Sequence, residues 1–282
     1  MIKITECPRD AMQGIKQIIP SELKVKYINQ LLKVGFDTID FGSFVSPKAI
    51  PQLRDTAEVL SKLDLNTTKS KLLAIIANQR GAEDACQFEE ISYLGFPFSI
   101  SETFQRLNTN ATIAESLKRV EEMQNLCMKH NKEMVVYISM AFGNPYGDEC
   151  NFEILHKSIS DLNQLGITIM PLSDILGNAK AELIEETFES IIPTFKNVEF
   201  GMHLHTRAAD YYDKIDAAYK ANCRKFDSVI NGYGGCPKTG KGLVGNLNTM
   251  DFMNYLNKNN IAIDLNKEEL TTAQILAQKV FV

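Results

Sequence analysis

Tryptophan is absent from this sequence of 282 residues, and only four histidines occur in it. No apolar run reaches the roughly 18 residues that a membrane-spanning helix requires. Charged residues stand near the N-terminus, where a secretory signal peptide needs its apolar region. The net charge is −5, whereas nucleic-acid-binding proteins usually carry an excess of basic residues. These absences predict a cytoplasmic protein with no membrane or nucleic-acid partner, although a local basic patch would still suit a small anionic ligand.

Closely spaced cysteine pairs of the CxxC type are also lacking. Six cysteines are scattered irregularly, at positions 7, 86, 127, 150, 223 and 236. In a chain of this size without a secretory signal, reduced thiols are a better interpretation than a disulfide framework. Most of these cysteines are expected to be small buried hydrophobic residues. Cys236 is treated separately because it stands in a glycine-rich segment.

Linkers and low-complexity stretches are missing as well. Hydrophobic residues make up 44% of the chain and charged residues 23%, a globular composition that excludes a disordered or collagen-like protein. The length allows two domains, but single α/β barrels of about 250 residues are common. We therefore predict a single catalytic domain over residues 1–282.

Short β-type runs alternate with helical patterns along the chain. The β-type runs are 2–6, 36–41, 71–77, 134–140, 167–172, 198–205 and 225–230, with an eighth expected near 90–94, before a turn at 95–97. Helical spacing of apolar residues marks the stretches 21–35, 112–130, 152–165, 179–192 and 208–222. Such alternation predicts a parallel sheet built from βαβ units.

Eight strands over this length favour a closed (β/α)8 barrel, or TIM barrel, with the residues after about Lys258 forming a helical tail outside it. An open doubly wound sheet is the alternative. The first strand is not followed by a GxGxxG fingerprint, which weakens the dinucleotide-binding form of that alternative. In a (β/α)8 barrel the functional residues stand at the C-terminal ends of the strands, so candidate site residues are sought there.

Two of the four histidines, His203 and His205, close the predicted strand at 198–205. Residues i and i+2 of a strand face the same side, so both imidazoles are expected to point into the barrel mouth. At that separation they suit metal ligation, whereas two ordinary histidines, one satisfying a hydrogen bond in the core, are the alternative. His130 and His156 lie in helical stretches and are interpreted as surface or helix-end residues.

Carboxylates follow two other predicted strands. Arg9 and Asp10 come just after the first strand, where Asp10 suits a divalent cation and Arg9 suits an oxyanion. A salt-bridged turn is the simpler interpretation of that pair. Asp174 follows the strand at 167–172 and either faces the site or caps the next helix. Carboxylates at two strand ends and the histidine pair at a third are harder to dismiss together than singly.

Glycines crowd the segment 232–242, which carries Cys236. Such a segment predicts a mobile loop of the kind that closes over active sites. Residues 235–241 spell GxxxxGK, but Gly242 stands where a P-loop needs Ser or Thr, so nucleotide binding is disfavoured. Cys236 is a reactive thiol if nearby positive charge lowers its pKa, and otherwise an inert loop cysteine. Asn246, just beyond this segment, is either a helix cap or a ligand.

Seven short motifs resemble, in order along the chain, those of the hydroxymethylglutaryl-CoA lyase family, within the wider group of metal-dependent barrel lyases and condensing enzymes. They are Pro8-Arg9-Asp10 with Gln13 and Lys16, Ser43 to Lys48 with Pro51-Gln52, 142–146, Ser173-Asp174 with Gly177, His203 with His205, 234–237, and Gly245-Asn246. The resemblance covers residues 4–251, nearly the whole chain, and seven motifs in family order are a specific signal.

The resemblance implies an enzyme that cleaves 3-hydroxy-3-methylglutaryl-CoA into acetyl-CoA and acetoacetate, as in leucine degradation. It implies one divalent cation, magnesium or manganese with zinc or iron as alternatives, held by Asp10, His203, His205 and Asn246. It further implies that catalysis is assisted by Arg9, Asp40, Asp174, His203 and Cys236. A cation would acidify the tertiary hydroxyl of the substrate, and Arg9 would neutralise the enolate oxygen.

Coenzyme A is long and polyanionic, so it is expected to lie across the barrel mouth. Lys48 and Lys16 are the candidates for contact with its phosphates, with solvated surface charge as the alternative for both. Homo-oligomerisation is left open by the sequence.

Several positions depart from the family pattern. Residues 206–209 read Thr-Arg-Ala-Ala where the family usually has Asp-Thr-x-Gly, and Asp40 replaces a glutamate. Ala11-Met12 replaces Gly-Leu, Lys238 replaces a tyrosine, and the stretch from Cys236 to Asn246 is one residue longer. These departures leave the exact acyl-CoA open, more than the reaction class.

Three other functions compete with the lyase. A related condensing enzyme would join acetyl-CoA to a 2-oxo acid, but the Cys236 segment favours the lyase and the short stretch 258–282 leaves no room for the regulatory domain of many synthases. A non-catalytic barrel that binds metal or acyl-CoA is favoured only by the altered residues after His205. A nucleotide-binding protein is the most distant alternative.

Overall fold

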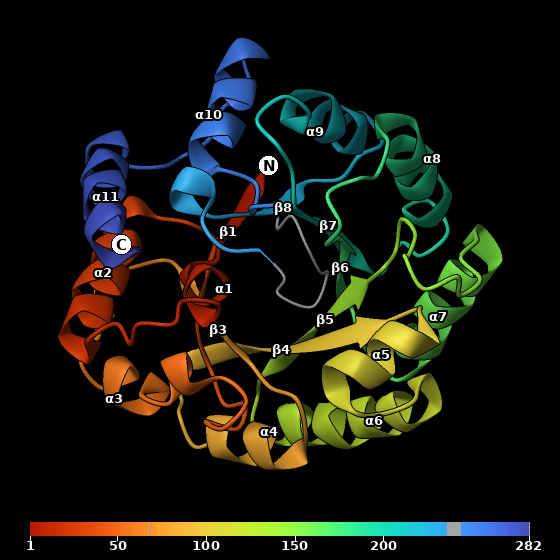
Figure 1. Ribbon diagram of the computed structural model, residues 1–282, viewed down its shortest axis with the longest axis horizontal. Helices are drawn as coiled ribbons and strands as arrows, with labels where there is room; N and C mark the ends of the chain where they lie inside the picture. Colours follow the sequence, from red (N-terminus) through yellow and green to blue (C-terminus); the bar gives the residue numbers. More distant parts are fainter. Residues whose placement is uncertain (67, 236–243, 282) are drawn as a thin grey trace.

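The computed structural model describes residues 1–66, 68–235 and 244–281. Eight parallel strands close in sequence order into a barrel, with β1 pairing both β2 and β8 (Figure 1). The strands are β1 (Lys3–Glu6), β2 (Thr38–Ser43), β3 (Lys71–Ile75), β4 (Ile91–Ser99), β5 (Glu133–Ser139), β6 (Ile169–Asp174), β7 (Glu199–Leu204) and β8 (Lys225–Ser228). The predicted (β/α)8 barrel is confirmed.

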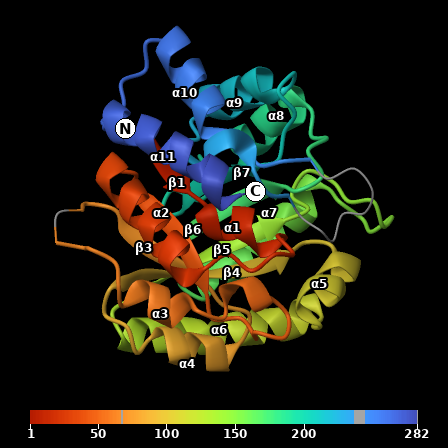
Figure 2. The ribbon, with the colours of Figure 1, turned by 60° about the vertical axis from the view of Figure 1, so that its left-hand side comes forward.

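Helices surround the barrel on its outside, except α1, which lies over the end of β1 (Figures 1 and 2). They are α1 (Pro8–Gln13), α2 (Ser21–Val34), α3 (Thr56–Leu60), α4 (Gln79–Ala85), α5 (Glu102–Thr109), α6 (Ile113–Lys129), α7 (Phe152–Gln164), α8 (Ala181–Ile191), α9 (Tyr211–Lys220), α10 (Thr249–Lys258) and α11 (Lys267–Val280), with the 3-10 turns η1 (Pro51–Leu53) and η2 (Ile230–Gly232). In the part of the chain that is described, no helix is both long and apolar enough to cross a membrane.

Local signals account for several helix ends. Thr112 and Glu115 form a reciprocal capping box at the start of α6, which satisfies two of the otherwise unpaired backbone N–H groups there. Asn151 accepts a hydrogen bond from the backbone of Ile154 at the start of α7. Gly35 ends α2 with a φ of 87°, a left-handed conformation that favours glycine. These ends agree with the sequence pattern to within one or two residues.

The C-terminal helix α11 packs against α2 on the outside of the barrel (Figure 2). The side chain of Gln30 donates hydrogen bonds to both the backbone and the side chain of Glu269. The backbone N–H of Asn266, just before α11, donates to the carbonyl of Val34 at 2.9 Å. The predicted helical tail is therefore present.

The fourth strand corrects one expectation. The sequence predicted a strand near 90–94 followed by a turn at Gly95–Pro97, whereas β4 continues to Ser99 and pairs in register with β5 as far as Ser139. Gly95 serves close packing, because a Cβ atom there would lie 2.5 Å from the side chain of Ile75. Pairing with β3 ends at Gly95, so Pro97 lies where β4 pairs with one neighbour only, a position that tolerates proline.

Apolar side chains fill the interior of the barrel. Leu73, Ile75, Val135 and Ile169 pack there with two tyrosines, Tyr93 and Tyr137. A larger cluster of buried residues fills the space between the strands and the helices. Because the interior is packed, ligands are confined to the mouth at the C-terminal ends of the strands.

Candidate active site

Arg9 and Asp10 stand at the start of α1, directly above β1. Pro8 begins this helix, a position where the missing N–H of proline costs nothing. The Arg9 guanidinium donates from Nη1 to Asp10 Oδ1 at 3.1 Å and to Gln13 Oε1 at 2.9 Å. Gln13 in turn donates to Asp10 Oδ1 at 2.7 Å. The first turn of α1 thus holds a cation and a carboxylate side by side at the mouth.

Asp40, in the middle of β2, holds the other side of the Arg9 guanidinium. Nε and Nη2 of Arg9 donate to Asp40 Oδ2 at 3.0 and 2.5 Å, and the Asp40 side chain is fully buried. Burial raises the pKa of Asp40 to about 6, although the charge of Arg9 acts in the opposite direction. This paired contact fixes the plane of the guanidinium beside Asp10.

His203 and His205 point into the same mouth from β7. Nδ1 of His203 donates to Asp227 Oδ2 at 3.0 Å, and Nδ1 of His205 donates to the carbonyl of Val244 at 3.1 Å. A carbonyl can only accept, so the proton of His205 lies on Nδ1 and its Nε2 carries a free lone pair. In both rings Nε2 remains for a ligand.

Asp10 completes a cluster with the two histidines. One ligand atom from each of Asp10, His203 and His205 lies within 4.8 Å of the others, and all three residues are buried. Burial alone would raise the pKa of Asp10, but the charge of Arg9, followed by those of the histidines, lowers it below its ordinary value. Asp10 is therefore ionised at neutral pH.

The cluster fits a divalent cation by the chemistry of its donors. Metal-binding histidines usually donate their second ring N–H to a carboxylate or a backbone carbonyl, as His203 and His205 do. Two imidazoles with a carboxylate suit manganese, zinc or iron, and added oxygen ligands from substrate or water would suit magnesium.

Asn246 reaches the cluster on a segment that returns to the barrel after the undescribed residues. The backbone of this return segment, residues 244–249, is inserted between the ends of β7 and β8: Leu247 N–H donates to Leu204 O at 2.8 Å, and Val229 N–H donates to Leu247 O at 2.9 Å. The Asn246 side chain donates from Nδ2 to Asp10 Oδ2 at 2.7 Å. To ligate a cation, the amide of Asn246 must turn so that its oxygen faces the cluster.

A cavity of about 310 Å³ opens beside this cluster. The polar part of its lining includes Arg9, Asp10, Gln13, His203 and His205. The apolar part includes Val45, Ala49, Ile50, Ile75, Ala77, Pro97, Phe104, Tyr137 and Ile175. The cavity can therefore accommodate both the polar groups and the apolar substituents of an acyl group.

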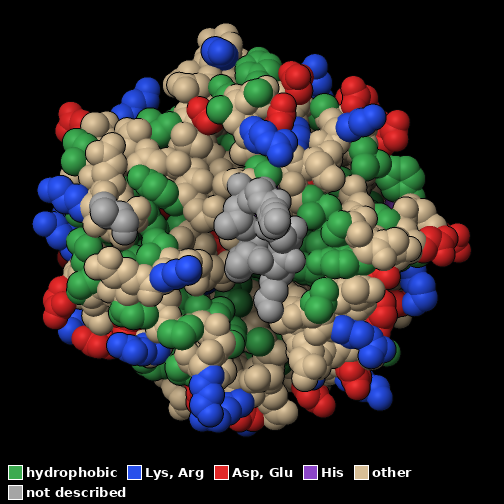
Figure 3. All heavy atoms as spheres, in the orientation of Figure 1, with side chains coloured by type: hydrophobic (Ala, Val, Ile, Leu, Met, Phe, Trp, Pro, Cys, Tyr) green, Lys and Arg blue, Asp and Glu red, His purple; other side chains and the backbone are tan. Residues whose placement is uncertain are grey.

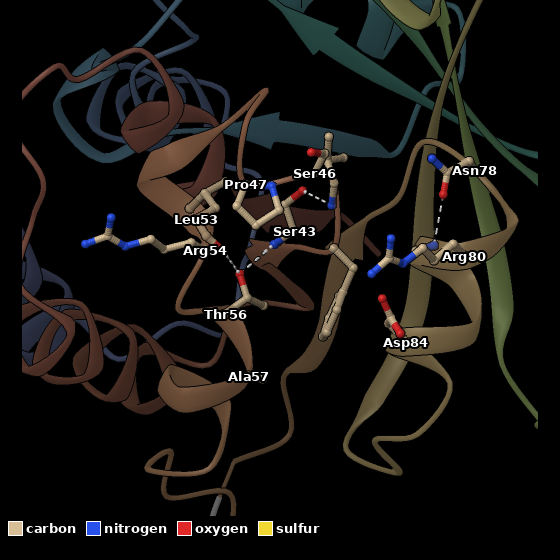
Figure 4. Close-up of a pocket in the computed structure, with 13 residues that line it drawn as sticks. Ser43, Ser46, Pro47, Leu53, Arg54, Thr56, Ala57, Asn78, Arg80 and Asp84 are labelled. Atoms are coloured by element: carbon tan, nitrogen blue, oxygen red, sulfur yellow. Dashed lines mark hydrogen bonds between the residues drawn. The ribbon is translucent and has the colours of Figure 1, made fainter.

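A second cavity of about 280 Å³ lies behind the loop that follows β2 (Figure 4). Val45 lines both cavities, so this loop separates them. Thr56 fixes the loop: its Oγ1 accepts from the backbone of Ser43 at 3.0 Å and donates to the carbonyl of Leu53 at 2.8 Å. These two contacts of Thr56, drawn in Figure 4, thus stabilise the loop that borders both cavities.

Asp174 lies at the end of β6 but is not among the residues that line the first cavity. Its carboxylate accepts from the backbone of Asn178 and Ala179 at 3.3 and 3.1 Å and from Lys214 Nζ at 3.1 Å. Lys214 is 5% exposed and also donates to the carbonyl of Gly177. In this arrangement Asp174 organises the loop between β6 and α8.

Lys16 and Lys48, the two residues predicted to contact phosphates, are not among the residues that line the cavity. Lys16 and Lys48 are exposed and stand in the loops after α1 and β2. On the face shown in Figure 3, lysine and arginine side chains are spread around the rim among acidic ones and form no single patch. Cys236, and with it most of the GxxxxGK stretch, lies outside the described residues.

Two supporting residues were not found from the sequence. Asp227 in β8 looks like any polar residue of a strand, yet it holds the imidazole of His203. Lys214 has the helical spacing of a surface residue, yet it is buried against Asp174. The alternation along β8 was the available signal for Asp227, because its side chain faces the barrel interior as Thr5 and His203 do in the paired registers.

Comparisons with known proteins identify the family of this chain. Residues 2–276 match the family model described as HMGL-like. A hydroxymethylglutaryl-CoA lyase from Bacillus subtilis is 31% identical over 266 residues, which cover 94% of this chain and 88% of that protein. A crystal structure of the Bacillus subtilis HMG-CoA lyase superposes with a TM-score of 0.91 at 30% identity and covers 99% of this chain and 93% of the other.

A second solved structure carries ligands. An HMG-CoA lyase from Acinetobacter baumannii, in complex with coenzyme A and 3-methylmalate, superposes with a TM-score of 0.91 at 26% identity. The alignment covers 100% of this chain and 91% of that one.

Proposed function

The chain belongs to the HMGL-like family and is a carbon–carbon lyase, and from this premise we propose that it cleaves 3-hydroxy-3-methylglutaryl-CoA, or a close 3-hydroxy acyl-CoA, to acetyl-CoA and acetoacetate. The observation that carries the proposal is the cluster of Asp10, His203 and His205, which lines a cavity together with Arg9 and with apolar side chains.

Asp10, His203, His205 and Asn246 are the proposed ligands of one divalent cation, magnesium or manganese in the first instance and zinc as the alternative. When bound, such a cation supplies Lewis acidity toward the hydroxyl and carboxylate oxygens of the substrate. The hydrogen bonds from Nδ1 of both histidines hold the rings in the orientation that this role requires.

The reaction itself needs a base, an anion site and an acid. A base removes the proton from the C3 hydroxyl, the C2–C3 bond breaks, and its electron pair forms the enolate of acetyl-CoA while C3 becomes the ketone of acetoacetate. We assign the proton transfer at the hydroxyl to Nε2 of His203, because its Nδ1–H is held by Asp227. Nε2 has a single lone pair, so in this step the proposed ligands of the cation are Asp10, His205 and Asn246. Arg9 donates to the enolate oxygen as charge develops there, and Asp40 keeps its guanidinium in place.

Protonation of the enolate carbon completes the reaction. We assign this step to Cys236, which stands in the chain between the described residues Gly235 and Val244. Replacing Cys236 with alanine should lower kcat by about 10²-fold or more while cation binding persists. A Cys236→Ala enzyme that turns over at the parental rate would remove Cys236 from the mechanism.

Asp174 is proposed to act through the loop that it organises. Its carboxylate holds the backbone of Asn178 and Ala179, and Ile175, the residue after Asp174, lines the cavity. Lys48 and Lys16 are proposed to contact the phosphates of coenzyme A at the mouth. A Lys48→Ala enzyme that binds coenzyme A with unchanged affinity and salt dependence would contradict that role for Lys48.

The setting of the protein is also part of the proposal. We propose a reducing, cytoplasmic environment, because the cysteines of the described residues (Cys7, Cys86, Cys127, Cys150 and Cys223) are free thiols. We propose that the protein forms a homo-oligomer. Measuring its molecular mass in solution tests this proposal.

The decisive experiment supplies the purified protein with Mg²⁺ or Mn²⁺ and a series of 3-hydroxy-3-alkylglutaryl-CoA esters, and measures acetyl-CoA and the 3-oxo acid together. Equal amounts of both products, dependent on the cation, are expected. Cation binding without product from any ester would leave a non-catalytic barrel as the better description. If the protein instead joins acetyl-CoA to a 2-oxo acid through a new carbon–carbon bond, it is a condensing enzyme.

A further inference from the structure

A carboxyl group with no place in the mechanism lies fully buried beneath the site. Glu6, the last residue of β1, is 0% exposed. Its Oε1 accepts from the backbone N–H of Ile230 at 2.8 Å, and its Oε2 lies within hydrogen-bond distance of the Thr249 hydroxyl, at 2.7 Å. A carboxyl group in an apolar interior is costly unless its hydrogen bonds are made, so these two contacts are what stabilises it there.

The two partners of Glu6, Ile230 and Thr249, lie in two segments that pack together near Asn246. Ile230 is the second residue after the end of β8, and Thr249 ends the return segment, residues 244–249. The backbone already joins these two places, because Thr249 N–H donates to Val229 O at 3.1 Å. The Thr249 hydroxyl also lies 2.9 Å from that of Ser228, the last residue of β8. Glu6 therefore fastens the return segment to β8 and ties both of them to β1.

The return segment sets two groups of the proposed cation site. Val244 O accepts from His205 Nδ1 at 3.1 Å, and Asn246 Nδ2 donates to Asp10 Oδ2 at 2.7 Å. His205 and Asn246 are also paired through the backbone as an isolated antiparallel bridge. A shift of the segment would move the Val244 carbonyl and the Asn246 amide together.

We infer that Glu6 and Thr249 are positioning residues, which fix the return segment and through it the placement of Asn246 and His205 around the cation. This inference rests on the proposed cation site and adds to it a support that touches neither substrate nor cation. Asp10 lies four residues after Glu6, in the helix α1 that follows β1. Glu6 and the proposed ligand Asp10 therefore belong to the same short stretch of backbone.

The protonation state of Glu6 suggests which variants to compare. Burial raises the pKa of Glu6 to about 8, against the lowering effect of the hydrogen bonds from Ile230 and Thr249. The neutral acid therefore predominates at pH 7, and its proton lies on Oε2, which donates to the Thr249 hydroxyl, because Oε1 accepts from Ile230. Glutamine has the shape and the neutral charge of that acid and keeps an oxygen for Ile230, so Glu6→Gln is a conservative variant and Glu6→Ala a disruptive one.

Thr249→Val is the cleanest change, because valine keeps the shape of threonine and lacks only the hydroxyl. The matched control is Thr187→Val: Thr187 is also buried, at 1% exposed, and its hydroxyl donates to Leu183 O within α8, away from the site. Both variants lose one buried hydroxyl, so a general loss of stability affects them alike.

The experiment measures Mn²⁺ affinity of the substrate-free protein by calorimetric titration, with kcat and KM alongside. Thr249→Val is expected to weaken Mn²⁺ binding about 10-fold, the lower end of the effect of losing a support of a metal ligand. Thr187→Val should leave the affinity unchanged, and Glu6→Gln should retain more of it than Thr249→Val. Equal Mn²⁺ affinity in the two threonine variants would overturn the inference.

A second readout keeps the inference separate from the proposed function. Amide hydrogen exchange of Leu247, whose N–H donates to Leu204 O, should become faster in Thr249→Val than in Thr187→Val. If the parental protein binds no Mn²⁺, the proposed cation site fails, and exchange at Leu247 still tests whether Glu6 and Thr249 fix the segment. Unchanged exchange at Leu247 would overturn the inference whatever the outcome for Mn²⁺.

Discussion

The carboxylate of Asp227 and the imidazole of His203 lie side by side in the barrel, with Oδ2 of Asp227 3.0 Å from Nδ1 of His203. Asp227 is 2% exposed, and its other oxygen has no hydrogen-bond partner among the described atoms. Burial alone would lower the pKa of His203, but the hydrogen bond and charge of Asp227 raise it above its ordinary value. The contact orients the ring and leaves Nε2 directed away from Asp227.

Replacing Asp227 with asparagine should therefore weaken the cation site without touching a ligand. The neutral amide is a poorer acceptor for His203 Nδ1–H, and losing such a carboxylate typically costs about 10- to 100-fold in metal affinity or activity. The measurement is Mn²⁺ affinity and kcat for the variant beside the parent. Parental values of both would mean that Asp227 only fills space in the barrel.

His205 offers a sharper test, because it is a proposed ligand itself. His205→Ala should abolish tight cation binding and activity, since one imidazole of the cluster is lost. The control is His156→Ala in α7, where the imidazole contacts Ser190 far from the mouth and no loss of activity is expected. Full cation occupancy together with turnover in His205→Ala would exclude His205 from the ligand set.

Arg9 is expected to act on the reaction more than on the cation. Lysine at this position keeps the charge, but it cannot donate to Asp40 and Asp10 at once through a planar fork. Arg9→Lys should lower kcat by about 10²- to 10³-fold, the scale of a lost donor to a developing oxyanion. Mn²⁺ binding should persist within a few-fold, which titration of the same sample checks. A variant with much weaker Mn²⁺ affinity but the parental kcat at saturating Mn²⁺ would show that Arg9 acts on cation binding instead.

The fold was predictable because its signals are repeated along the chain, whereas the supports of the site were not. Strand and helix periods recur eight times, so an error at Gly95–Pro97 shifts one strand end and leaves the barrel intact. The mouth residues Arg9, Asp10, His203 and His205 were found because parallel strands bring their C-terminal ends together. Contacts such as Asp227 with His203 depend on register between strands, which no single segment of sequence contains.

Lys214 illustrates the same limit, since its helical spacing conceals a buried ion pair with Asp174. Lys214→Met should lower the free energy of unfolding by about 3 kcal/mol, because it leaves a buried carboxylate without its partner. Lys220→Met on the same helix removes a surface ion pair with Asp216 and should leave the free energy of unfolding nearly unchanged. Denaturant unfolding of both variants provides the comparison. If both variants lose the same free energy of unfolding, the buried pair of Lys214 and Asp174 stabilises the protein no more than the pair at the surface.

Glu6 should make the stability of the protein depend on pH. Its pKa is about 8 in the folded protein and near the ordinary 4.5 in the unfolded chain, so between these values the folded state binds more protons. Stability contributed by the neutral acid is fully present below about pH 4.5 and is lost as the pH rises through about 8. The free energy of unfolding should then fall by up to about 1.4 kcal/mol per pH unit across this window.

Glu6→Gln isolates this contribution, because glutamine does not titrate. Burial raises the pKa of Asp40 to about 6, so Asp40 also lowers the free energy of unfolding as the pH rises, and it does so equally in the parent and in Glu6→Gln. The difference in free energy of unfolding between the two proteins is therefore due to Glu6. Denaturant unfolding at a series of pH values between 5 and 9 should give curves that converge at low pH, with the parent losing more stability toward pH 8. The return segment would loosen with it, since ionised Glu6 is the less favourable form in its buried position. Parallel curves for the parent and Glu6→Gln would mean that Glu6 keeps the same charge in the folded and unfolded protein.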